Sequence, residues 1–241
     1  MIPITDEGLL RGDGAFEVIR LYDGVPFALD EHLERMSRTA AGIRLPLDTA
    51  AYEAEIAALL AADPPGDAQL RLVATRGGRR LAIVEPLAAG PATLALRTVT
   101  YSPPRLLDDI KSLSYAANML ATRIAVERGG DEALLVTPHG RVLEAPTSSI
   151  FWVSDGNAFT PPLDDHILAS ITRAIVIELT GAVERACTLD DLRSADEVFL
   201  ASTIREVQSV SSVNEVSFEN IGPVTSSTAE AFSTRVQAEL E

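Results

Sequence analysis

Hydrophobic positions alternate with polar ones, or gather in short β-branched runs bounded by turn residues, in several segments of the first hundred residues. These patterns predict strands at residues 15–22, 69–76, 81–87 and 92–99. Between them, apolar residues recur at helical spacing over residues 30–43, with Asp30 as the expected N-cap, and residues 49–62 are rich in alanine. We therefore expect an α+β arrangement in this part of the chain.

The second half of the chain also mixes the two patterns. Helices are expected at about 116–128, where Gly129 and Gly130 end the pattern, at 170–181, and from Ser226 onward. Strands are expected at residues 132–137, 141–144, 148–153 and 197–203. No regular βαβ alternation or glycine fingerprint of a dinucleotide-binding fold occurs.

The segment TYSPPR separates the two halves. Its Pro103–Pro104 pair cannot continue a helix or a central strand, so it is the best candidate for a linker. We expect a small α/β domain over residues 1–102 and a larger cofactor-binding domain over residues 103–241.

Charge and composition exclude several classes of function. A net charge of -15 and a pI near 4.6 argue against non-specific binding to nucleic acid or to an anionic membrane. Cys187 is the only cysteine, and His32, His139 and His166 are far apart in the sequence, so we expect no disulfide framework and no metal site. No signal-peptide pattern and no long apolar run is present, which favours a soluble cytoplasmic protein.

Lys111 is the one lysine among the 20 basic residues of the chain. Arginine serves at least as well as lysine in ion pairs and on surfaces. A guanidinium stays protonated, however, whereas an amine can lose its proton, attack a carbonyl and form a Schiff base. The single lysine therefore suggests this covalent chemistry, and the alternative is an arginine-biased composition that left one lysine by chance.

Six ordered motifs support the covalent interpretation, and they extend over nearly the whole chain. They are GDGAFEVIR (12–20), DEHLERM (30–36), IKSLSYAANMLA (110–121), LEAPTSSIF (143–151), ILASITRAIV (167–176) and DEVFLASTIREV (196–207). Together they resemble the class IV, fold-type IV pyridoxal-phosphate enzymes, which include branched-chain and D-amino-acid aminotransferases, R-selective amine transaminases and aminodeoxychorismate lyase. The resemblance implies a two-domain α+β fold like that of D-amino-acid aminotransferase.

The resemblance also implies roles for particular residues. Lys111 matches the lysine that holds pyridoxal 5'-phosphate and later carries the substrate's proton. Glu144 matches the glutamate that binds the pyridine nitrogen and keeps the ring protonated. Arg35 matches the phosphate-binding arginine, although its place on an amphipathic helix would otherwise suggest a solvated charge.

The remaining cofactor contacts are expected from three other segments. Ile171 and Thr172 open a helix whose N–H groups would bind the phosphate, together with Thr203 and Ser202. Tyr115 would meet the phenolic oxygen of the ring, or would serve only in packing.

Some positions depart from the family pattern. Ala145 stands where glycine is usual, Ser149 where asparagine is usual, and Ser170 where glycine is usual, which affects the hydrogen bonding expected around the cofactor. Only eleven residues precede Gly12, where the family has one or two strands. We therefore expect a shortened first domain or a sequence that starts late.

Three functions fit these motifs. Phe16–Glu17 favours an aminotransferase acting on an amino acid or amine and a 2-keto acid, with Phe16 and Arg79 or Arg80 expected at the substrate. The runs KSLSYAANM and LEAP also resemble lyases that release pyruvate and 4-aminobenzoate from aminodeoxychorismate. A non-catalytic protein that binds the cofactor is the third possibility, and a homodimer is implied by the resemblance alone.

Overall fold

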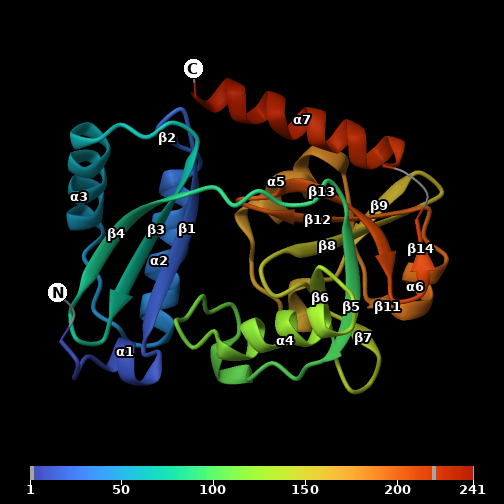
Figure 1. Cartoon of the computed structure of the whole chain (residues 1–241), viewed down its shortest axis with the longest axis horizontal. Coiled ribbons are helices and arrows are strands. Elements are labelled where there is room, and N and C mark those ends of the chain that lie inside the picture. Colours follow the sequence, from blue (N-terminus) through green and yellow to red (C-terminus); the bar gives the residue numbers. More distant parts are fainter. Residues whose placement is uncertain (1–2, 219–220, 241) are drawn as a thin grey trace. The chain divides into compact units, whose positions relative to one another are not determined.

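The computed structural model describes residues 3–218 and 221–240, which form two compact units (Figure 1). The first unit holds the residues up to Ala89 and the segment Asp109–Tyr115. The second unit holds Gly90–Asp108 and Ala116–Glu239. The segment that carries Lys111 therefore belongs to the first unit, although it follows the first part of the second unit in sequence.

The first unit is an antiparallel sheet with helices. The strand order is β2-β1-β3-β4, and neighbouring strands are antiparallel. The strands are β1 (Gly14–Tyr22), β2 (Val25–Pro26), β3 (Ala68–Thr75) and β4 (Arg80–Pro86). The helices are α1 (Glu7–Arg11), α2 (Leu29–Gly42) and α3 (Thr49–Ala62).

One apolar core joins the two longer helices to this sheet. Ile19 of β1 and Leu70 of β3 are fully buried in the same cluster as Met36 of α2 and Tyr52 of α3. Residues of β3 alternate between buried and partly exposed, as the sequence pattern requires for a sheet covered on one face. Each such fully buried large side chain contributes roughly 1.5–3 kcal/mol to folding, so this core holds α2 firmly in place.

The second unit is built on one ten-stranded mixed sheet. The order is β10-β9-β8-β12-β13-β5-β6-β7-β11, and β14 pairs with β13. The first five of these strands in sequence are β5 (Leu94–Thr100), β6 (Glu132–Val136), β7 (Arg141–Val142), β8 (Ser149–Ser154) and β9 (Asn157–Thr160). The others are β10 (Val183–Glu184), β11 (Cys187–Thr188), β12 (Glu197–Ser202), β13 (Glu206–Val213) and β14 (Val216–Ser217).

Helices cover this sheet. They are α4 (Ala116–Glu127), α5 (Ile171–Thr180), α6 (Leu189–Arg193) and α7 (Pro223–Leu240), with short 3-10 turns at Arg105–Leu107 and Leu163–Asp165. α4 packs on β5 and β6 through small buried residues such as Ala121 and Ala125, and α5 packs on β12 (Figure 1). No helix in residues 3–218 and 221–240 is long and apolar enough to cross a membrane.

The expected α+β fold is confirmed, and the predicted helices and strands occur near their predicted bounds. The N-cap of α2 was predicted wrongly: the helix begins at Leu29 behind Ala28, whose φ of 53° is left-handed, and Asp30 lies in the first turn. The sequence placed residues 92–99 in the first domain. In the structure β5 pairs in parallel with β6 and β13, and these long-range pairs put it in the second unit.

Candidate functional site

Lys111 lies on an extended segment that runs beside the start of β1. The backbone N–H of Phe16 donates to the carbonyl oxygen of Lys111 at 3.1 Å, and the N–H of Lys111 donates to Thr39 Oγ1 on α2 at 3.2 Å. Nearby, the N–H of Leu113 donates to the carbonyl of Gly14 at 2.9 Å. A Cβ at Gly14 would lie 2.3 Å from the carbonyl oxygen of Ala74, so only glycine permits this close approach. The backbone of Lys111 is thus held by both the sheet and α2.

Two aromatic rings lie beside the Lys111 amine. Its Nζ is 4.5 Å from the centre of the Phe16 ring and 6.0 Å from the centre of the Tyr115 ring. The two rings meet edge to face, with centres 5.2 Å apart and planes at 79°. The structure therefore brings together three of the residues that the sequence assigned to the site.

Arg35 forms a buried cluster with two residues of the first unit. Its Nε and Nη2 donate to Glu17 Oε1 and Oε2 at 2.7 and 2.6 Å, and His32 Nδ1 lies 2.8 Å from Glu17 Oε2. Glu17 is 0% exposed, and the other two side chains are nearly as buried. The bidentate contact fixes the plane and direction of the guanidinium. The sequence predicted Arg35 but assigned it to phosphate, and it did not find this partner.

Charge and burial oppose each other in this cluster. Burial disfavours the ionised form of Glu17, but the charge of Arg35 and hydrogen bonds from Arg35 and His32 lower its pKa from 4.5 to about 2. Burial lowers the pKa of His32 below 6.5, and its hydrogen bond to Glu17 only partly compensates. At neutral pH, Glu17 is therefore an anion, His32 is neutral, and Arg35 carries the matching positive charge.

Glu144 follows β7 in the second unit. Its backbone carbonyl accepts from the N–H of Leu135 at 2.9 Å, and its Oε1 accepts from the N–H of Leu168 at 3.4 Å. Immediately after it, the N–H of Ala145 donates to the carbonyl of Ser148 at 2.8 Å and closes a turn. Burial raises the pKa of Tyr101, and the negative charge of Glu144 raises it further. Glu144 therefore lies on a defined turn, with its carboxylate near Tyr101.

The predicted phosphate ligands lie on two other segments of this unit. Ser170 caps α5, since its Oγ accepts from the N–H of Arg173 at 3.2 Å. Ile171 and Thr172 follow in the first turn, where N–H groups and the helix dipole favour an anion. Ser170, one of the three residues that depart from the family pattern, thus serves as a helix cap.

Ser202 and Thr203 lie at the other segment, a hairpin between β12 and β13. Ser202 pairs with Glu206, so the loop has three residues, and Ser202 Oγ accepts from the N–H of Arg205 at 3.3 Å. The Arg205 side chain leaves this loop and contacts Glu132, Thr147 and Ser148. The sequence did not single out Arg205. Its one available signal was a basic residue two positions after Thr203.

The two candidate substrate arginines have different surroundings. Arg80, at the start of β4, donates from Nη2 to Glu55 Oε1 of α3 at 2.7 Å. Arg79 is exposed in the turn, where its backbone N–H donates to Thr75 Oγ1 at 3.3 Å. The ion pair engages Arg80 within the first unit, whereas the Arg79 side chain is exposed.

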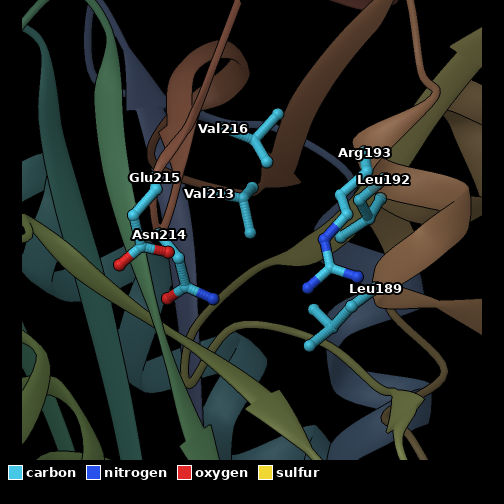
Figure 2. Close-up of a pocket in the computed structure, with 7 residues that line it drawn as sticks. All are labelled: Leu189, Leu192, Arg193, Val213, Asn214, Glu215 and Val216. Atoms are coloured by element: carbon cyan, nitrogen blue, oxygen red, sulfur yellow. The ribbon is translucent and has the colours of Figure 1, made fainter.

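A pocket in the second unit lies between α6 and the β13–β14 turn (Figure 2). Leu189, Leu192 and Arg193 line one side of it, and the turn residues around Asn214 line the other. Arg193 is paired with Asp190, and Asn214 Oδ1 accepts from the N–H of Thr98 at 3.0 Å. None of its seven lining residues is a predicted site residue, so this pocket does not bear on the candidate site.

Known protein families and proteins resemble this chain over most of its length. The family model of amino-transferase class IV matches residues 14–213. A putative branched-chain-amino-acid aminotransferase of Methanocaldococcus jannaschii is 35% identical over 96% of this chain and 90% of its own length. A D-alanine aminotransferase of Bacillus licheniformis is 32% identical over 88% of this chain and 83% of its own length. The solved fold IV-transaminase of Curtobacterium pusillum superposes with a TM-score of 0.87 at 30% identity, over 99% of this chain and 90% of that one.

Proposed function

The chain belongs to the amino-transferase class IV family, and from this premise we propose that its amino transfer uses pyridoxal phosphate held by Lys111. The reaction moves an amino group between an amino acid or amine and a 2-keto acid. The fold is that of fold-type IV transaminases. The single observation that carries the assignment to Lys111 is the placement of its amine beside Phe16 and Tyr115, on a backbone fixed from two sides.

The residues present fit this cofactor. An amine suits its aldehyde, the carboxylate of Glu144 suits its ring nitrogen, and helix N–H groups with a guanidinium suit its phosphate. When bound, pyridoxal phosphate would supply the aldehyde and the electron-accepting ring that amino transfer requires.

Four residues of this chain would bind the cofactor, orient it or carry protons. We assign Lys111 to hold the cofactor and then to carry a proton to and from the reacting carbon of the substrate. Glu144, as a carboxylate, would keep a proton on the ring nitrogen. Glu17 holds the Arg35 guanidinium in one orientation, which would favour its use as a fixed phosphate ligand.

The remaining site residues act through N–H and hydroxyl groups. Ile171 and Thr172 would offer the first-turn N–H groups of α5 to the phosphate, and Ser202 and Thr203 would add the hairpin. Phe16 would pack at the substrate and Arg79 would pair with its carboxylate, with Arg80 the alternative.

Lys111 can be tested by borohydride reduction of the loaded protein, followed by peptide mapping. Because the chain contains one lysine, the cofactor mass should appear on the peptide that carries Lys111 and on no other internal peptide. Lys111→Arg is the matched control, since it keeps the positive charge but removes the reactive amine, and it should take up no label. A label confined to the N-terminal amine, or an equal label on the arginine variant, would refute the assignment.

The amino donor is the next unknown. The two relatives are a putative branched-chain and a D-alanine aminotransferase, so a donor panel should contain branched-chain L-amino acids and D-alanine. We expect a donor to bleach the visible band of the bound cofactor and a keto acid to restore it. No comparison favours the lyase more strongly than amino transfer. Pyruvate released from aminodeoxychorismate without a keto acid, with no donor able to bleach the band, would reverse that choice.

Two further expectations stay predictions. They are the homodimer implied by the family resemblance and the cytoplasmic location. Sedimentation of the purified protein at several concentrations would test the first, and fractionation of the cell of origin would test the second.

A further inference from the structure

We propose that Arg205 is a positioning residue that ties the turn after Glu144 to the hairpin that carries Ser202 and Thr203. The inference rests on the proposed function, because it assumes that both segments hold the cofactor. Arg205 itself is not proposed to touch cofactor or substrate. Its role is to keep two groups of ligands, far apart in the sequence, at one fixed separation.

The Arg205 guanidinium reaches across from the hairpin to the turn. Its Nη1 donates to Thr147 Oγ1 at 3.2 Å and to Ser148 Oγ at 3.0 Å. The backbone N–H of the same residue donates to Ser202 Oγ. One residue is therefore hydrogen-bonded to the hairpin through its main chain and to the turn through its side chain.

A buried carboxylate holds the other side of the guanidinium. Arg205 Nη2 donates to Glu132 Oε2 at 2.7 Å, and Glu132, at the start of β6, is 2% exposed. Glu132 Oε1 accepts from Thr122 Oγ1 of α4 at 2.7 Å. Both oxygens of the Glu132 carboxylate thus accept hydrogen bonds, which fixes its orientation. The fixed carboxylate in turn orients the planar guanidinium of Arg205.

The same turn has a second anchor on α4. Asn118 Nδ2 donates to the carbonyl of Pro146 at 3.0 Å. The contact between Ala145 and Ser148 closes this turn, and Glu144 directly precedes it. The turn is therefore held by α4 and by Arg205. Loss of the Arg205 contacts would release the turn on one side. The distance between the carboxylate of Glu144 and the hydroxyl of Thr203 would then no longer be fixed.

An ion pair that serves stability alone would also explain the contact between Arg205 and Glu132. The two explanations differ at Thr147 and Ser148. A stabilising pair needs only the carboxylate, whereas positioning needs the hydroxyl contacts to the turn. Removal of those hydroxyls leaves the buried charge of Glu132 paired, so the protein should fold normally.

The experiment therefore compares three variants with wild type. The double variant T147V and S148A removes both hydroxyls and keeps the ion pair. Arg205→Lys keeps the charge opposite Glu132 but lacks the fork that spans both partners. Arg97→Lys is the matched control, because Arg97 also bridges several groups, the carbonyls of Arg128 and Gly129 among them, and contacts none of the candidate cofactor residues.

Each protein is stripped of cofactor and titrated with pyridoxal phosphate, and the visible band of the loaded protein is followed against pH. Thermal unfolding of each stripped protein reports its fold. We expect the double variant and Arg205→Lys to bind the cofactor roughly tenfold more weakly, which is the size of one hydrogen bond lost between the charged cofactor and a displaced ligand. Their visible bands should also titrate at a shifted pH. Arg97→Lys should lower the unfolding temperature without either change.

The outcomes separate the two proposals. Binding of pyridoxal phosphate within about twofold of wild type in both test variants, with unchanged visible spectra, would overturn the role of Arg205. So would a loss of affinity in Arg97→Lys equal to that in the test variants. If wild type itself binds no pyridoxal phosphate, the proposed function has failed instead.

Discussion

Glu17→Gln is the substitution whose effect the structure defines most fully. Glu17 is 0% exposed and accepts two hydrogen bonds from Arg35, with His32 2.8 Å from the same carboxylate. Glutamine has nearly the same shape, so packing is kept while the charge is lost. The change therefore measures the buried ion pair and little else.

The magnitude follows from the pKa of Glu17. A fall from 4.5 in the unfolded chain to about 2 in the folded protein corresponds to about 3 kcal/mol of stability when the carboxylate is ionised. Removal of one member of a buried pair costs about 3–5 kcal/mol, which agrees with this value. We therefore expect Glu17→Gln to lower the free energy of unfolding at pH 7 by about 3 kcal/mol.

The pH dependence has a definite sign. Because the folded pKa of Glu17 is depressed, its contribution is fully present above pH 4.5 and is lost as pH falls towards 2. By pH 3.5 the contribution of Glu17 itself should have fallen by about 1 kcal/mol. His32, whose folded pKa is also lowered, destabilises the folded protein as pH falls below 6.5, and it does so more in the variant, which lacks the Glu17 carboxylate that partly raises this pKa.

Urea unfolding at several pH values between 7 and 3.5 measures these differences. Glu55→Gln is the matched control, since Glu55 pairs with Arg80 at 2.7 Å but its side chain is 42% exposed. An exposed pair of this kind is worth at most about 1 kcal/mol. Equal losses of stability in the two variants at pH 7 would refute the reasoning.

Two other predictions concern the second unit. Glu144→Gln should retain the cofactor but slow amino transfer at least tenfold, a loss of about 1.4 kcal/mol of transition-state stabilisation, because a neutral amide cannot keep the ring nitrogen protonated. Single-turnover bleaching by an amino donor measures this rate. Turnover within threefold of wild type would show that Glu144 does not bind the ring nitrogen. Cys187 is fully buried, and burial raises the pKa of its thiol, so a maleimide should label it only in urea. Rapid labelling of the folded protein at pH 8 would contradict this burial.

The sequence determined the local elements and the chemistry of one residue. Helical spacing placed α2 and alternation placed β3 close to their observed bounds, because these periods follow from backbone geometry alone. Alanine content placed α3, because alanine has the highest intrinsic helix propensity. The single lysine and the motifs around it indicated the cofactor class, since an amine is the group that such chemistry requires. The family comparison then agreed with that class.

The tertiary structure decided which elements are neighbours. β5 follows the first unit in sequence, yet its partners β6 and β13 place it in the second, and β13, with its run of polar residues, was not predicted at all. Whether a polar segment forms a strand depends on the neighbouring strand with which it pairs, and that strand can be distant in the sequence.

The same holds for the polar groups around the candidate ligands. Glu17 and Arg35 are 18 residues apart, and Glu132 and Arg205 are 73 residues apart. Nothing in the sequence pairs either carboxylate with its arginine. A charge becomes a fixed, buried partner only when folding removes water from both groups and leaves them no alternative contact. Sequence periodicity cannot specify that event, because it depends on which residues the completed sheets bring together.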